Sequence, residues 1–187
     1  MAEQPKKVSR AVLERIEFCY PAPKGLPVPI KPGRGSANVL EQIQSLDRNS
    51  FLTSRTADLI RSGAFWLYGF LEESHVISQE IHTGEGSYWH GLMHRSEGDF
   101  SNSMYWFRRV GKHAIFPDLL EAVKSLEPTS KSRQEILKGV GSVSTWEPQW
   151  LVDLCEEAYR GRFRDFDLIQ QISSIEYNLL MKYCLEI

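Results

Sequence analysis

The last helical pattern of the chain restricts the fold more than any other feature. Between residues 165 and 184, the apolar residues Leu168, Ile172, Ile175 and Leu179 follow one another at steps of four, three and four. This spacing matches the period of an α-helix and places all four side chains on one face. The segment therefore predicts a long amphipathic helix that needs a partner surface to cover its apolar side.

Other segments repeat this period between recognisable start and stop signals. Pro117 and Pro148 stand where a helix begins, because a first-turn residue needs no N–H donor. Ser36 can cap one helix, and the pair Ser132 and Glu135 matches a capping box for another. With residues 165–184, the expected helices cover residues 8–20, 36–45, 60–82, 88–96, 99–110, 117–126, 132–138 and 148–161. The sequence predicts an all-α helical bundle.

Two of these helices leave alternatives open. Gly63 and Gly69 lie inside the 60–82 pattern, and each costs about 1 kcal/mol relative to alanine in a helix. The segment is therefore one helix or two, and only an uninterrupted helix would continue the apolar row of Leu67 to His75 and His82. Residues 15–20 and 105–107 also suit strands.

The N-terminal region is expected to lie outside the helical bundle. Five of the nine prolines fall between Pro21 and Pro32, and each proline removes a backbone donor and fixes φ. Residues 21–35 should therefore be extended and wrapped over the helices, after a flexible leader at residues 1–7. We expect one domain over residues 1–187, in which residues 1–35 form the leader and the proline-rich arm.

Composition excludes several classes of protein. A net charge of −2 and the lack of a long basic face give no reason to expect a nucleic-acid partner. The longest apolar run, residues 64–71, is far shorter than the ~20 residues that cross a membrane, and the polar N-terminus has no signal-peptide core. Cys19, Cys155 and Cys184 lack any CxxC pair and are expected to be reduced core thiols of a cytoplasmic protein, although a disulfide between two of them stays open.

The histidines mark the candidate site. All five lie between His75 and His113, and three of the five tryptophans, Trp66, Trp89 and Trp106, lie in or beside the same window. Such a concentration of titratable and aromatic side chains favours a pocket for a small-molecule ligand.

A metal site is the sharpest hypothesis for this window. His90 and His94 are four residues apart, so a helix would present both imidazoles on one face, and Glu97 would extend the row by a carboxylate. This ligand set suits zinc or non-haem iron. Gly91 occupies the place of the glutamate in the HExxH motif of metalloproteases, so that motif is absent. Alternatively, both rings are partly buried and hydrogen-bonded to the backbone or to Asp99.

Acid–base chemistry is the second hypothesis. Glu72, His75, Gln79 and His82 follow one another at helical spacing, and histidine titrates near neutral pH. The candidate catalytic residues are His75, His90 and His94. The alternative is the polar end of a buried helix, which is the interpretation we favour for His82.

Ligand binding is the third hypothesis. Arginines near helix starts can bind phosphate or carboxylate, and exposed aromatic rings can stack on a planar ligand. Arg108 and Arg109 could equally cap their own helix and pair with nearby acids. The candidate ligand-binding residues are Arg95, Asp99, Asn102 and Trp106.

One stretch resembles a known signature. The run from Gly86 to Gly111, which contains YWHGLMHR and GDFSNSMYWFRRVG, is similar to the signature of a family of uncharacterised bacterial and fungal proteins, and Glu73 to Gln79 resembles the same family. No activity is assigned to that family, so the resemblance implies kinship without a reaction.

The leading hypothesis is a cytoplasmic small-molecule-binding protein, and a candidate enzyme, with its pocket around residues 75–109. A divalent metal, zinc or iron, is the candidate cofactor. The rival hypothesis is a non-catalytic interaction or structural module in which the aromatic residues form core and the proline-rich arm engages a partner chain.

Overall fold

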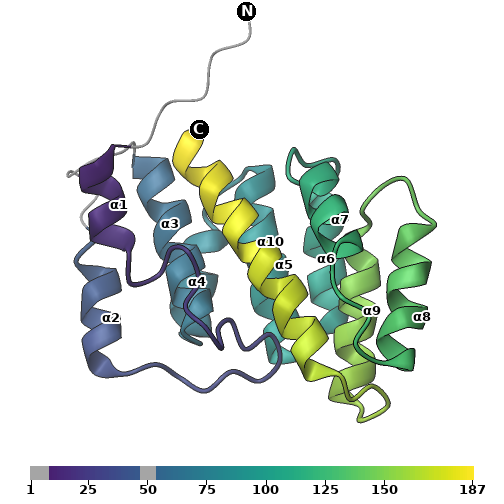
Figure 1. Cartoon of the computed structure of the whole chain (residues 1–187). Helices are drawn as coiled ribbons and strands as arrows, with labels where there is room; N and C mark the ends of the chain where they lie inside the picture. The colour runs from purple at the N-terminus through teal and green to yellow at the C-terminus, as the bar shows by residue number, and fades with distance from the viewer. Residues whose placement is uncertain (1–8, 47–53) are drawn as a thin grey trace, which may run out of the picture.

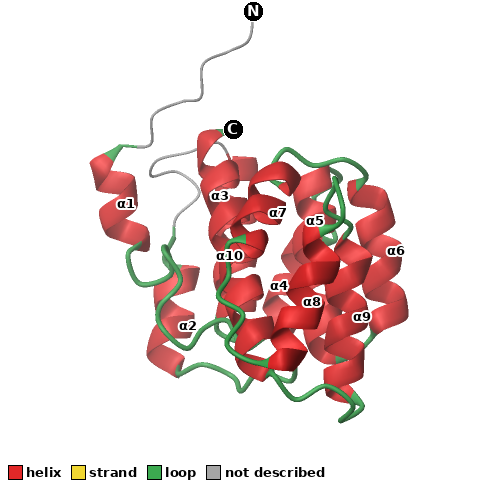
Figure 2. Cartoon of the chain, turned by 45° about the vertical axis from the view of Figure 1, so that its right-hand side comes forward, coloured by secondary structure: helices red, strands yellow, loops and turns green. Residues whose placement is uncertain are grey.

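A computed structural model describes residues 9–46 and 54–187. Within these ranges the chain forms ten α-helices and no strand, which confirms the all-α prediction (Figures 1 and 2). The predicted leader at residues 1–7 lies outside the described residues. The helices are α1 (Arg10–Ile16), α2 (Ala37–Gln44), α3 (Ser54–Leu67), α4 (Leu71–Ser78), α5 (Gly84–Glu97), α6 (Phe100–Val110), α7 (Phe116–Lys124), α8 (Lys131–Gly141), α9 (Pro148–Tyr159) and α10 (Phe166–Glu186).

Local start signals place some helices correctly and others a few residues away. Ser36 caps α2 by accepting a hydrogen bond from the Val39 N–H, and Pro148 opens α9. The capping box expected at Ser132 is wrong, because the extended backbone of Ser130 lets its hydroxyl accept from Arg133 N at 3.1 Å and start α8 earlier.

The 60–82 pattern forms two helices, because the chain turns at Gly69. Gly69 has φ +71°, and a Cβ there would lie 2.3 Å from the carbonyl oxygen of Gly33. Only glycine permits this conformation together with so close an approach of the arm. His75 therefore lies on a separate helix, α4, instead of on a continuation of α3.

The proline-rich arm lies against α10, and it has no regular structure, as predicted (Figure 1). Three side chains of α10 bind its backbone. Asn178 Oδ1 accepts from Ala22 N at 2.8 Å, Ser174 Oγ donates to Leu26 O at 2.8 Å, and Gln170 Nε2 donates to Gly25 O at 2.6 Å. These contacts satisfy backbone groups that no helix or sheet would satisfy.

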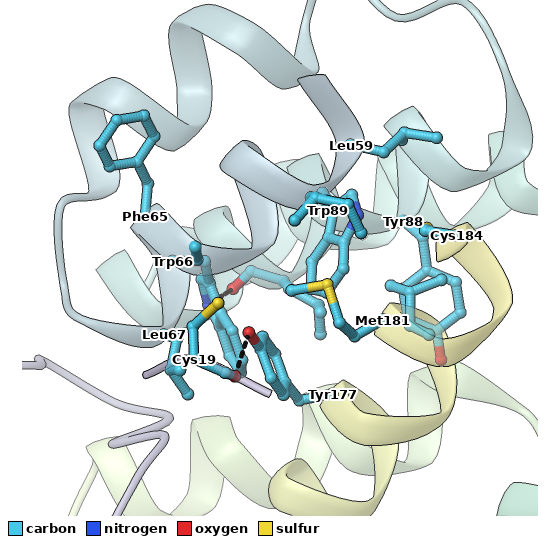
Figure 3. Close-up of a cluster of buried hydrophobic side chains, with 14 of the residues drawn as sticks. Cys19, Leu59, Phe65, Trp66, Leu67, Tyr88, Trp89, Tyr177, Met181 and Cys184 are labelled. Carbon is cyan, nitrogen blue, oxygen red and sulfur yellow. Dashed lines mark hydrogen bonds between the residues drawn. The ribbon is translucent and has the colours of Figure 1, made fainter. Parts of the chain in front are cut away.

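Helices α9 and α10 both contribute fully buried residues to two apolar clusters. The first cluster includes Trp66, Trp89 and Tyr177, and Tyr177 OH donates to Cys19 O at 2.9 Å (Figure 3). The second cluster includes Leu151 and Ile172.

The predicted core face of α10 is only partly right. Leu168 and Ile172 are fully buried, as is Leu151 on α9, whereas Ile175 and Leu179 are partly buried. The fully buried side of α10 instead includes Ser173, Glu176, Tyr177 and Leu180. The spacing of apolar residues predicts the wrong buried face because it does not count Glu176, a charged residue that the core holds in an ion pair.

The three cysteines are free and buried, as expected for reduced core thiols. Cys19 and Cys184 belong to the first cluster, and Cys155 belongs to the second. Burial raises the pKa of the Cys19 and Cys155 thiols to about 12. Among the helices described, none is both long and apolar enough to cross a membrane.

Candidate metal centre

Two helices bring three histidines together. His75 comes from α4, and His90 and His94 come from α5. One ring nitrogen from each residue can be chosen so that all three lie within 4.8 Å of one another. His90 and His94 are buried, whereas His75 is half-buried, so the cluster is most open on the side of His75. His90 and His94 thus present their rings on one face of α5, as predicted, and His75 of α4 supplies the third ring.

The close packing of α5 and α6 forms one side of this cluster. His90 and His94 are one helical turn apart and share a face. Between them, Gly91 lets α6 approach, because a Cβ there would lie 3.2 Å from the Phe107 ring, and Ser103 Oγ donates to Gly91 O at 2.8 Å. The glycine that breaks the metalloprotease motif is thus a packing position.

The surroundings of His90 select its tautomer. Ser78 Oγ lies 3.1 Å from His90 Nδ1 and 3.3 Å from the carbonyl oxygen of His75. A hydroxyl has one proton, so a serine that donates to His75 O must accept from His90 Nδ1–H. This arrangement leaves a lone pair on His90 Nε2. The Trp106 ring packs on the same imidazole, with ring centroids 4.0 Å apart.

The surroundings of His94 select the same tautomer. Asn102 Nδ2 donates to His94 Nε2 at 3.0 Å, and His94 Nδ1 lies 3.2 Å from Glu97 Oε2. Nδ1 therefore carries the proton and donates it to the carboxylate.

Glu97, predicted as the third metal ligand, is not part of this histidine cluster, and its carboxylate instead contacts Nδ1 of the His94 ring. At a spacing of three residues, with the helix ending at Gly98, the side chain reaches Nδ1 and no further. His75 occupies the third position in the cluster.

Burial keeps the paired rings uncharged. Burial, together with charge repulsion from His94 and His75, lowers the pKa of His90 to about 3. Burial also lowers the pKa of His94, against the opposing pull of Glu97. Neutral imidazole is the form that binds metal ions.

No family model, curated protein or solved structure matches this chain. The likeness of residues 86–111 to a family signature stays a prediction, and any function has to be inferred from the geometry of the site.

The other predicted site residues have different roles. Asn102 and Trp106 contact the histidines, as described above. Asp99 caps α6 by accepting from Asn102 N at 3.1 Å, so it supports the site from the helix start.

The structure does not bring Arg95 into the cluster. Its side chain is fully buried, and Arg95 Nη2 lies 2.6 Å from Glu176 Oε2 on α10. Tyr88 OH donates to the other oxygen of the same carboxylate at 3.0 Å. One residue beyond His94, the helix has turned by about 100°, which directs Arg95 into the core and away from any ligand at the histidines.

The two remaining histidines lie elsewhere. His82 is exposed after the end of α4, as favoured from the sequence. The His113 side chain is 4% exposed and packs against Tyr88, Phe116 and Tyr183. Sequence reasoning did not single out Ser78 as a site residue, although its position three residues after His75 is a usable signal.

Proposed function

We propose that this protein binds one divalent transition-metal ion through His75, His90 and His94. The observation that carries the proposal is the convergence of one nitrogen from each of these rings within 4.8 Å. Zinc–nitrogen bonds of about 2.0–2.1 Å imply separations of roughly 3.3 Å between ligands of a tetrahedral ion. Binding therefore requires the half-buried His75 side chain and its partners to move inward by about an ångström or more.

The groups around the rings support this proposal. Metal-binding histidines commonly donate their other N–H to a carboxylate or another acceptor, which fixes the tautomer. His94 has Glu97 in this role, and His90 has Ser78. In the bound form Asn102 would give up its contact with His94 Nε2 and become free to bond a molecule next to the ion.

Zinc is the ion that the ligand set favours over iron. Non-haem iron sites of oxygenases typically combine two histidines with one carboxylate, whereas three histidines are a known zinc set. Three protein ligands leave a fourth position for water, and zinc lowers the pKa of a bound water to near 7. We therefore propose a zinc-dependent enzyme that adds water to, or hydrolyses, a small substrate.

The rival hypothesis of an interaction module has less support. It requires the proline-rich arm to engage a partner chain, but Gln170, Ser174 and Asn178 already bind the backbone of that arm. The three free buried cysteines support a reducing, cytoplasmic setting.

Zinc titration of the purified protein tests the proposal. After treatment with a chelator and its removal, calorimetry should show one zinc ion per chain. Each of His75→Ala, His90→Ala and His94→Ala should weaken binding at least about tenfold, because each removes a ligand. His82→Ala is the matched control, since this exposed histidine lies outside the cluster, and it should bind like the wild type.

Thermal unfolding supplies a second readout. Zinc at a hundred times the wild-type Kd should stabilise the wild type by about 2.7 kcal/mol and His94→Ala by about 1.4 kcal/mol or less, because its binding is at least about tenfold weaker. A chain that takes up no zinc, or that binds it equally well after all three substitutions, would refute the metal centre.

A further inference from the structure

A concave site lies on the side of α6 away from the histidine cluster. This groove has a volume of about 620 Å³, within the range of pockets that hold drug-sized organic molecules. It is lined by residues of α6, the start of α7, the loop before α9 and the first turn of α9. Those that define its chemistry are Met104, Phe107, Arg108, Lys112, Phe116 and Glu147.

Helix α6 separates this groove from the cluster of His75, His90 and His94, whereas His113 is one of the groove-lining residues. Asn102 and Trp106 contact His94 and His90, whereas Phe107 and Arg108 line the groove. At about 100° per residue, Arg108 lies roughly 120° to 160° around the helix from both histidine contacts. A molecule in the groove would therefore not contact a metal ion held by the histidines.

The groove wall is mainly apolar. Phe107 is 4% exposed overall, and Met104 and Phe116 are partly buried and pack against the first apolar cluster. Trp146, from the loop before α9, adds a further ring to the lining. An aliphatic or aromatic body would bury apolar surface against these side chains.

The charged residues that line the groove indicate which polar group its ligand carries. Arg108 and Lys112 are exposed, and neither forms an ion pair with another described residue. Glu147 is the acidic residue of the lining. The first turns of α7 and α9 also line the groove, and neither helix has a side-chain cap. Helix starts carry partial positive charge, but Asp118 in the first turn of α7 offsets one of them. The positive balance of the lining therefore comes from Arg108 and Lys112, which outnumber Glu147.

We propose that the groove binds a small organic anion, a carboxylate attached to an apolar body. The apolar wall holds the body, and Arg108 with Lys112 holds the carboxylate. This site is distinct from the proposed metal centre and does not depend on it.

Calorimetric titration with octanoate tests the proposal, with octanol and inorganic phosphate as the two matched probes. Octanoate should bind saturably and more tightly than either probe, because octanol lacks the charge and phosphate lacks the apolar body. Equal binding of octanoate and octanol would overturn the anion assignment. Equal binding of phosphate, or no saturable binding of octanoate, would overturn the ligand class.

Three single-charge variants make the test specific to the groove. Arg108→Gln and Lys112→Gln should each weaken octanoate binding by up to roughly fivefold, the upper end expected for exposed charge pairs. Glu147→Gln should strengthen it, because this substitution removes the opposing carboxylate. Arg164→Gln is the control, since this exposed arginine lies outside the groove, and it should change nothing.

His75→Ala distinguishes the two sites. It should weaken zinc binding at least about tenfold and leave octanoate binding intact, whereas an equal loss of both would contradict a separate groove. Because all the charged positions are exposed, far-ultraviolet circular dichroism should show unchanged helix in every variant. If octanoate binds with the same affinity to the wild type and to the variants at Arg108, Lys112 and Glu147, the proposal is refuted.

Discussion

Two adjacent residues of α5, His94 and Arg95, lie in different environments. His94 contacts Glu97 and Asn102 at the edge of the cluster, while Arg95 pairs with Glu176 inside the core. Burying an ion pair is costly unless its polar atoms have partners, and Tyr88 OH provides one to Glu176. This pair joins α5 to α10 and so helps to hold the helix that carries two of the three histidines.

Glu97 should tune the metal site without touching the ion. Removing the acceptor of a ligand's N–H typically costs ten- to a hundredfold in metal affinity. We expect Glu97→Ala to weaken zinc binding by roughly tenfold or more, and Glu97→Gln to recover part of the loss, because its amide oxygen can still accept from His94 Nδ1. Zinc calorimetry measures both variants. Glu80→Ala, at an exposed position, should bind like the wild type, and an equal loss there would contradict a specific role.

His113 should make the stability of the fold depend on pH. Burial lowers its pKa below the ordinary value of 6.5, against the weaker pull of Glu85. Between the two pKa values the unfolded chain binds more protons than the folded chain, so the free energy of unfolding falls as the pH drops below about 6.5. His113→Phe should reduce this dependence below about pH 6.5 without removing it, because the lowered pKa values of His90 and His94 act in the same direction, and urea unfolding at each pH measures the difference. Equal slopes in both proteins would show that His113 does not contribute.

At the scale of the elements, local signals were predictable and long-range contacts were not. Ser36 and Pro148 mark helix starts because the bonds they make or lack lie within one turn. Whether the helix ends at Gly63 or at Gly69 depends on contacts with residues distant in the sequence. Gly69 turns where the Gly33 carbonyl approaches, whereas Gly63 stays helical and makes room for the Trp89 ring, which would lie 2.7 Å from a Cβ at that position.

The same division applies to the candidate site. The spacing of His90 and His94 indicates a shared face, and the structure confirms it. His75 joins them because α4 folds back beside α5, a contact that no local pattern contains. Glu97 satisfies the spacing rule but ends on the wrong side of the ring. A period identifies which residues share a face, and the packing of helices decides which faces meet.

Asp99 should matter for α6 as a helix cap. Its carboxylate accepts from Asn102 N, and losing such a cap costs about 0.5–2 kcal/mol. We expect Asp99→Ala to reduce the free energy of unfolding by about 1 kcal/mol in urea titrations. Ser101→Ala is the comparison, because Ser101 Oγ only donates to Asp99. A larger loss for Ser101→Ala than for Asp99→Ala would show that the cap is misassigned.

At the scale of the whole molecule, stability should depend on the burial of α10. Ile172 is fully buried in the second cluster, so Ile172→Ala should cost about 2–5 kcal/mol. Ile175 is only partly buried on the same helix, and Ile175→Ala should cost clearly less. Urea unfolding of both variants measures the difference. Equal losses would mean that the buried face of α10 is wrongly placed.

The three buried thiols can be used as chemical probes of when the core of this protein opens to solvent. Cys155 lies in one apolar cluster, while Cys19 and Cys184 lie in the other. A thiol reagent reacts with the thiolate, and a raised pKa together with burial suppresses that form in the folded protein. Alkylation therefore proceeds only when a cluster is exposed to solvent. The order in which the three thiols become labelled would report whether the two halves of the core open together or one at a time.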